Sequence, residues 1–252
     1  MSAYDEAADA WADSAAPVYA RFAAAMVEHS PVPLSGATVL DVGAGTAVAC
    51  DAALAAGAQR AVASDVAEQM LRRRHPPTQA AVADAARLPF SDDRFDLVMG
   101  GFCLGHLPDP AAALAEWRRV GSATLATAFA PGPPHPAKVA VAEAAEQFGY
   151  VSQPWYERLK NELEPQVEDP GLLRTLARAA GHRTVEIVQL TVDTGLSTPA
   201  EIVSWRWGMA NLAPFVAGLP EDRRAEARRV AEEAVADIGP VRIEMQVLRA
   251  AD

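Results

Sequence analysis

The chain has 252 residues, half of them hydrophobic, and a net charge of −11. Such an acidic surface repels phosphate backbones and anionic lipids, so nucleic-acid and membrane partners are disfavoured. The sequence shows no membrane-spanning apolar run and no secretory signal, and its 2 cysteines lack the spacing of a disulfide scaffold or metal site. A cytoplasmic location is therefore expected.

Short apolar runs alternate with alanine-rich stretches, a pattern typical of a parallel sheet covered by helices. The expected strands are 38–42, 61–65, 80–83, 95–99, 123–130, 184–193 and 241–249. The expected helices are 46–56, 111–119, 137–148, 199–212, 221–236 and one that starts at Asp169-Pro170 and stops at Gly181. We predict an α/β fold with a doubly wound, seven-stranded, mostly parallel sheet.

Local signals support several of these boundaries. Gly57 can end the first of these helices in the left-handed conformation, and Asp109-Pro110 provides a cap and a first-turn proline. Thr198 and Glu201 form a capping box around Pro199. We expect one domain, 1–252, made of a helical lid (1–35), a cofactor-binding half (36–130) and a substrate-shaping half (131–252) with insertions after strands five and six.

The most informative segment is Val39-Leu-Asp-Val-Gly-Ala-Gly-Thr-Ala47. Glycines directly after a buried strand allow a tight turn and a close approach to a ligand, although an ordinary strand–helix turn has the same glycines. Asp41 would repel the pyrophosphate of a nicotinamide cofactor and suits a ligand with a cationic amino-acid end. Val48 also stands where the nicotinamide fingerprint requires glycine or alanine.

Two further acids follow the next strands. Asp65 closes the second strand, where a carboxylate can accept hydrogen bonds from ribose hydroxyls, and Asp84 follows the third. The carboxyl ends of parallel strands meet at one edge of the sheet, so these acids and Asp41 are expected to converge on one ligand site.

The ordered set of motifs resembles the class I S-adenosylmethionine-dependent methyltransferases, in the small-molecule and quinone-biosynthesis branch, over about residues 36–130. The motifs that carry the resemblance are Val-Leu-Asp-Val-Gly-Ala-Gly, Ser64-Asp65-Val66 with Met70, Asp84 with Leu88-Pro89-Phe90, Phe95-Asp-Leu-Val-Met99 and Leu104-Gly-His-Leu-Pro-Asp109. Ala47 departs from the family, which usually has a third glycine there.

The resemblance implies S-adenosylmethionine as cofactor and S-adenosylhomocysteine as product. It assigns the methionine part to Asp41, Gly43, Ala44, Gly45 and Gly100, the ribose to Asp65, the adenine to Val66 and Met70, and the adenine edge to Asp84 and Ala85. Tyr4, Trp11, Tyr19 and Arg21 precede the first strand, where relatives place a lid, and Tyr19 or Arg21 could meet the cofactor carboxylate. Aromatic helix packing explains the same residues equally well.

Three residues follow the fourth strand near the expected position of the transferred methyl group. His106 could deprotonate an acceptor, since imidazole titrates near working pH, although relatives often carry a non-catalytic histidine here. Phe102 would border the acceptor, and Cys103 fits a buried small apolar residue better than a nucleophile.

Aromatic residues of the second half indicate the acceptor site. Trp155 and Tyr156 favour a flat or apolar acceptor. Trp205, Arg206 and Met209 lie on the helix expected over 199–212, where Arg206 should face either water or an anionic group, which an acidic substrate could supply.

We therefore predict methyl transfer to a small molecule by a monomer or homodimer that uses no metal. Three alternatives remain on the sequence alone: a non-methylating rearrangement or cyclisation on the same fold, a nicotinamide dehydrogenase, and a non-catalytic binding module.

Overall fold

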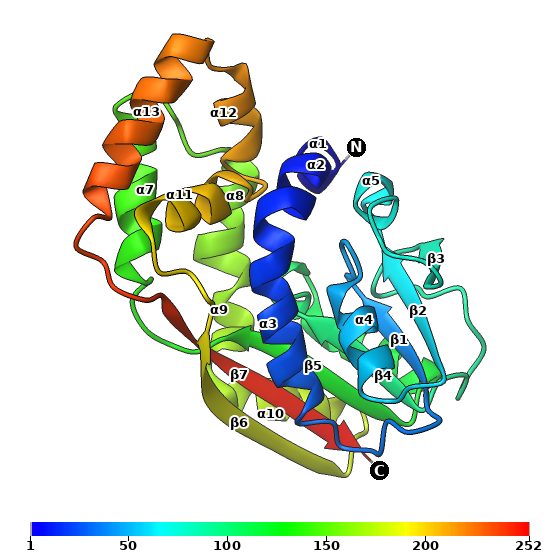
Figure 1. Ribbon diagram of the computed structural model, residues 1–252. Helices are drawn as coiled ribbons and strands as arrows, with labels where there is room; N and C mark the ends of the chain where they lie inside the picture. Colours follow the sequence, from blue (N-terminus) through cyan, green and yellow to red (C-terminus); the bar gives the residue numbers. More distant parts are fainter. Residues whose placement is uncertain (1, 252) are drawn as a thin grey trace.

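The computed structural model describes residues 2–251, which are built around a seven-stranded sheet (Figure 1). Its order is β3-β2-β1-β4-β5-β7-β6, with β7 antiparallel to both neighbours and the other pairs parallel. This confirms the predicted fold; residues 1 and 252, the ends of the predicted domain, lie outside the described residues. The strands are β1 (Thr38–Val42), β2 (Arg60–Asp65), β3 (Gln79–Val82), β4 (Leu97–Gly101), β5 (Ala123–Phe129), β6 (Thr184–Asp193) and β7 (Arg242–Ala251).

Helices fill the connections between the strands and form the N-terminal segment. Before β1 lie α1 (Ala3–Glu6), α2 (Ala8–Ala10), the π-helical η1 (Trp11–Ala15) and α3 (Ala16–Val27). Between β1 and β5 lie α4 (Val48–Ala55), α5 (Glu68–Leu71), the 3₁₀ turn η2 (Leu104–His106) and α6 (Pro110–Val120). The predicted insertion after β5 contains α7 (Pro136–Glu146), α8 (Pro154–Arg158), the π-helical η3 (Leu159–Leu163), α9 (Pro165–Glu168) and α10 (Pro170–Ala179). That after β6 contains α11 (Pro199–Trp207), α12 (Ala213–Gly218) and α13 (Glu221–Ala234).

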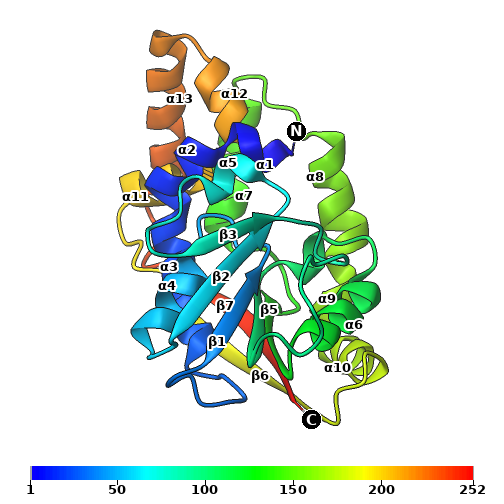
Figure 2. The ribbon, with the colours of Figure 1, turned by 90° about the vertical axis from the view of Figure 1, so that its right-hand side faces the viewer.

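The sheet is covered on both faces, as its apolar strands require. Alternate residues of one strand enter opposite layers: Val39 belongs to the core with α3 and α4, and Leu40 to the core with Trp117 of α6. Figure 2 shows α3 and α4 on one side of the sheet and α6 and α10 on the other. Helices α7, α11, α12 and α13 extend the first layer beyond the carboxyl ends of the strands (Figure 1).

Most predicted elements differ from the observed ones by one or two residues at an end, and two of the differences have an evident structural cause. The fourth strand begins at Leu97 rather than Phe95, because Asp93 has φ +50° and Phe95 forms only an isolated bridge with Gly121. The helix predicted over 199–212 ends at Trp207. Its cap, Gly208, packs so closely against η1 that a side chain there would overlap Ser14.

The N-terminal segment is helical, as predicted, and its first turns pack against two distant elements. α1 contacts α5, and η1 contacts α11. These contacts place residues 3–15 above the carboxyl edge of the sheet (Figure 1). Within residues 2–251, every helix is too short or too polar to cross a lipid bilayer.

Candidate active site

A cavity of about 640 Å³ lies at the carboxyl ends of the parallel strands. The N-terminal segment, the α8–α9 insertion and α11 complete its wall. Every residue predicted for cofactor, acceptor or catalysis lines this cavity except Arg21 and Gly100. The predicted convergence of distant motifs on one sheet edge is therefore observed, as open α/β folds generally show.

The glycine turn after β1 is packed from two sides. Gly43 and Gly45 have φ +68° and +54°, which favours glycine. A side chain on Gly43 would lie 2.5 Å from the Cys103 Sγ, and one on Gly45 would lie 3.2 Å from the Met70 Cε. Ala47, where the family has glycine, also adopts a left-handed conformation, with φ +65°. The alanine thus keeps the turn at a small cost in strain.

Asp65 fixes the glycine turn as well as facing the cavity. One carboxylate oxygen accepts the Gly45 N–H at 2.8 Å, and the other accepts the Ala67 N–H at 2.8 Å. Burial raises the pKa of Asp65, and these backbone donors partly counter that effect. Each oxygen has a second lone pair, so the carboxylate retains the capacity to accept hydroxyl donors from a ligand.

Asp41 is almost completely buried beneath the turn, and the Cys50 thiol donates to its carboxylate at 3.8 Å. Burial, followed by repulsion from Asp65, raises the pKa of Asp41 to about 8. A buried carboxylate of this kind gains most from a cationic partner. The two carboxylates of the cavity therefore fit the ammonium group and the ribose hydroxyls of S-adenosylmethionine.

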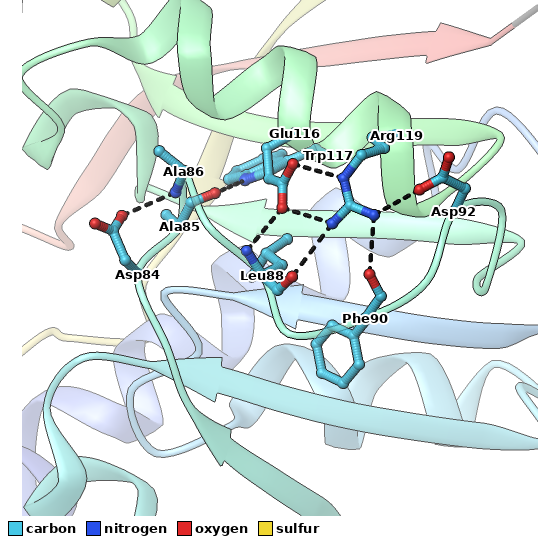
Figure 3. Close-up of polar contacts among 9 residues, drawn as sticks. All are labelled: Asp84, Ala85, Ala86, Leu88, Phe90, Asp92, Glu116, Trp117 and Arg119. Carbon is cyan, nitrogen blue, oxygen red and sulfur yellow. Dashed lines mark hydrogen bonds and ion pairs between the residues drawn. The ribbon is translucent and has the colours of Figure 1, made fainter.

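The loop that carries Asp84 and Ala85 is held by α6 (Figure 3). The Trp117 Nε1 donates to the Ala85 carbonyl at 3.1 Å, and Glu116 accepts the Leu88 N–H at 2.8 Å. The Arg119 guanidinium donates to the carbonyls of Phe90 and Leu88 and to the Asp92 carboxylate (Figure 3). These contacts from α6 hold the loop of Asp84 and Ala85 in place beside the cavity, a role that the predicted helix over 111–119 did not reveal.

Two predicted cofactor residues lie elsewhere. A side chain on Gly100 would overlap the Trp117 ring, so this glycine allows the helix to pack on β4, whereas the neighbouring Gly101 lines the cavity. Arg21 is exposed, and its guanidinium packs against Gly195 after β6. Helical periodicity turns Arg21 away from Tyr19, two positions earlier, which does line the cavity.

Aromatic side chains line the cavity around Phe102. Phe102 has φ +55°, a strained value for a bulky residue, and its N–H donates to Thr127. This backbone directs the Phe102 ring to within 4.5 Å of the Phe129 ring centroid and 5.6 Å of that of Tyr19. Cys103 packs on the glycine turn, and burial raises the pKa of its thiol, which agrees with an apolar role.

His106 meets a residue of the N-terminal segment inside the cavity. Its Nε2 lies 3.4 Å from the Tyr4 hydroxyl, and the two rings pack edge to face at 5.5 Å. Burial lowers the pKa of His106, so the imidazole is neutral near pH 7. Trp155 lies beyond Tyr4 at 6.1 Å between ring centroids. The pairing of Tyr4 with His106 spans 102 residues and has no local signal.

The cavity also contains basic residues that the sequence analysis did not select. The chain has two lysines, Lys138 and Lys160, and both line the cavity together with Arg206. Lys160 pairs with Glu164. The rarity of lysine was visible in the sequence, but the folding of both lysines into one cavity was not. Within residues 2–251, no cluster of three or more histidine, cysteine or carboxylate side chains is placed to hold a metal ion.

Comparison with known proteins defines the class. Residues 40–123 match the family described as a methyltransferase domain. A demethylmenaquinone methyltransferase of Clavibacter sepedonicus is 34% identical over 176 residues, which are 63% of this chain and 71% of that protein. That of Mycobacterium marinum is 45% identical over 86 residues, 34% of this chain and 37% of its own. The solved Haemonchus contortus phosphoethanolamine N-methyltransferase 2 in complex with S-adenosyl-L-methionine shares the fold, with a TM-score of 0.56 at 15% identity over 92% of this chain and 52% of that chain.

The fold is that of solved methyltransferase structures. The chain belongs to the S-adenosylmethionine-dependent methyltransferases of the quinone-biosynthesis type. Its cofactor is S-adenosylmethionine, and it transfers a methyl group to a small molecule. The predicted family, cofactor and enzyme class are thereby confirmed, and the nicotinamide dehydrogenase considered from the sequence is set aside.

Proposed function

We propose that the acceptor is a flat aromatic molecule with an ionisable hydroxyl or amine, and that His106, paired with Tyr4, takes its proton. The observation that carries this proposal is the 3.4 Å approach of the Tyr4 hydroxyl to the His106 Nε2 inside an aromatic cavity. The relatives named demethylmenaquinone methyltransferases support a ring acceptor. The cytoplasmic location, the monomeric or homodimeric state, the absence of nucleic-acid substrates and the division of a single domain 1–252 into lid and halves belong to the same proposal.

Asp41 would pair with the cofactor's ammonium group, and Asp65 would accept its ribose hydroxyls. Val66 and Met70 would contact the adenine, whose edge would meet the loop at Asp84. When bound, S-adenosylmethionine supplies a methyl group on a positively charged sulfur. The chain's contribution to such a displacement is alignment and the exclusion of water.

The N-terminal segment would exclude that water. Trp11 is buried and stacks on Tyr19, with ring centroids 4.7 Å apart, and both rings line the cavity. Tyr4 adds a third aromatic contact, 5.7 Å from Trp11. A closed aromatic roof lowers the local dielectric and strengthens each polar contact below it.

His106 would act as a neutral base. Its burial disfavours the charged form, and the resulting low pKa keeps the imidazole ready to accept a proton near neutrality. The Tyr4 hydroxyl, whose own pKa is raised by burial, stays protonated and can orient the imidazole through their contact.

The test compares cofactor binding with turnover. We expect calorimetry to show saturable binding of S-adenosylmethionine and S-adenosylhomocysteine but not of NADH. 1,4-Naphthohydroquinone and related hydroxylated aromatics then serve as acceptors, with release of S-adenosylhomocysteine and the product mass as readouts. His106→Ala should leave cofactor affinity unchanged and lower turnover by about 100-fold, the usual contribution of one acid–base group.

Tyr4→Phe is the matched variant, because it removes the hydroxyl and retains the ring. We expect it to lower turnover by less than His106→Ala and to shift the lower limb of the pH–rate profile. If His106→Ala keeps wild-type turnover, His106 is not the base. If the wild-type protein does not bind the cofactor, the non-catalytic alternative applies.

A further inference from the structure

The acceptor side of the cavity contains hydrogen-bond donors that lack acceptors. Lys138, Arg206 and Trp205 all line it. Ammonium and guanidinium groups donate and never accept. The protein has a net charge of −11, so positive groups gathered in one internal space are not a consequence of its composition. A ligand that satisfies both cations must be rich in acceptor atoms.

Arg206 is 4% exposed and sits on α11. Within residues 2–251, neither its Nε nor the Nε1 of Trp205 has a hydrogen-bond partner. The guanidinium carbon lies 5.3 Å from the Trp205 ring centroid, a cation–π contact. Such a contact does not replace the hydrogen bonds that a buried guanidinium gives up when it leaves water.

Lys138 approaches the same space from α7. Its Nζ lies 3.9 Å from the Phe129 ring centroid. Burial, followed by repulsion from Arg206 and Lys160, lowers the pKa of Lys138 to about 7. Among the ion pairs of the described chain, the neighbouring Glu164 is engaged by Lys160, and none joins a carboxylate to Lys138 or Arg206. The two cations therefore repel one another across the cavity.

Their place in the fold separates them from the cofactor's acids. Asp41 and Asp65 stand on β1 and β2, whereas Lys138 stacks on Phe129 at the end of β5. Because β4 lies between β1 and β5 and β2 lies on the far side of β1, the acidic and basic groups occupy different parts of the sheet edge. Phe129 in turn packs against Phe102, with ring centroids 4.5 Å apart.

We propose that the methyl acceptor carries an anionic oxygen group, a carboxylate on its aromatic framework, which Lys138 and Arg206 bind together. This inference rests on the proposed function and narrows its acceptor class. A carboxylate presents two oxygens to a guanidinium fork and an ammonium, and charge-assisted contacts of this kind are roughly twice as strong as neutral ones. A neutral quinol offers only uncharged hydroxyl oxygens, which form weaker contacts with the same two cations.

The test uses two probes that differ in charge and hardly in shape, 2-naphthoate and 2-naphthamide. Both are titrated by calorimetry into the protein saturated with S-adenosylhomocysteine. We expect the anion to bind about tenfold more tightly, as for a charge-assisted contact. Lys138→Met and Arg206→Met should each abolish that preference, while Arg174→Met, an exposed arginine on α10, should retain it.

A second readout distinguishes binding at Lys138 from a general change in shape. An anion beside Lys138 stabilises its charged form, so 2-naphthoate binding near pH 7.5 should take up a proton. Titrations in two buffers of different ionisation enthalpy measure that uptake. We expect it in the wild type and in Arg174→Met, and not in Lys138→Met.

Saturation with S-adenosylhomocysteine is measured first, so failure of the cofactor assignment is seen separately from failure of this inference. Equal affinities for the two probes, binding of neither, or a preference that survives both substitutions would overturn it. So would an Arg206→Met protein that loses S-adenosylhomocysteine affinity, because the arginine would then serve the cofactor. Arg206→Gln, which removes the charge but keeps a polar side chain, replaces Arg206→Met if thermal unfolding shows that the latter does not fold.

Discussion

The most specific prediction concerns Asp65, which is expected to serve both the cofactor and the glycine turn. Its two oxygens accept the N–H groups of Gly45 and Ala67 at 2.8 Å each. Asp65→Ala removes those acceptors together with the proposed anchor of the ribose. Asp65→Asn removes the charge but keeps the size and one acceptor oxygen.

The expected loss in cofactor affinity follows from the number of bonds. A hydrogen bond to a charged group contributes about 1.5–3 kcal/mol, so two ribose hydroxyls represent about 3–6 kcal/mol. Asp65→Ala should therefore raise the Kd for S-adenosylhomocysteine by about 10²–10⁴-fold. Asp65→Asn should fall between this variant and the wild type. Asp65→Asn sets an amide NH2 group against one of the two backbone N–H donors, so it should also lower the free energy of unfolding by about 1–3 kcal/mol.

Calorimetric titration with S-adenosylhomocysteine measures these affinities, and urea unfolding measures stability. Asp84→Ala is the matched control, since this carboxylate is exposed and its Oδ1 accepts the Ala86 N–H. Water competes for an exposed carboxylate, so this substitution should cost at most about tenfold in affinity. A Kd within threefold of wild type for a folded Asp65→Ala protein would refute the ribose assignment.

Three further predictions follow from the same geometry. Gly100→Ala would force a methyl group into the Trp117 ring and should lower the free energy of unfolding, measured in urea, by about 1–3 kcal/mol. Gly101→Ala has open space at the new Cβ and should leave that free energy unchanged. Equal stabilities of the two variants would show that α6 can shift. The pKa of Asp41 is raised to about 8, and only its ionised form pairs with an ammonium group. The affinity for S-adenosylhomocysteine should therefore fall by up to about tenfold per pH unit as pH drops from about 8 to about 6, and Asp41→Asn should bind weakly at every pH. An affinity of the wild type that does not depend on pH would contradict this. Arg119→Met releases two loop carbonyls and should weaken S-adenosylhomocysteine about three- to tenfold, with little change in calorimetric stoichiometry; unchanged affinity would mean that the loop holds its shape without it.

Most element positions could be predicted because their signals are local. The strand predicted at 184–193 has those bounds in the structure, and the Asp109 carboxylate caps α6 by accepting the Ala112 N–H at 2.9 Å. The capping box of Thr198 and Glu201 is also present. Each of these features depends on residues within a few positions of one another, where propensity and capping decide the conformation.

The helix end was predicted wrongly because contacts between residues distant in the sequence determine it. Apolar periodicity extended the helix predicted over 199–212, but the packing of Gly208 against Ser14, nearly 200 residues earlier, ends it at Trp207. The family resemblance assigned Gly100 to the methionine part of the cofactor, and in the structure this glycine lies against Trp117 rather than in the cavity lining. No local pattern records which neighbour a glycine will face.

The doubly wound fold could be predicted from the sequence because apolar alternation sets the strands, and acids placed after successive parallel strands must meet at one edge of the sheet. The family and the cofactor were implied by the resemblance of the ordered motifs. The residues that meet on the acceptor side of the cavity could be identified only in the folded structure. Tyr4 meets His106, and Lys138 faces Arg206, across connections whose length and path carry no periodic signal. The electrostatic character of that space depends on burial and on neighbours brought together by packing, and neither quantity exists until the chain has folded.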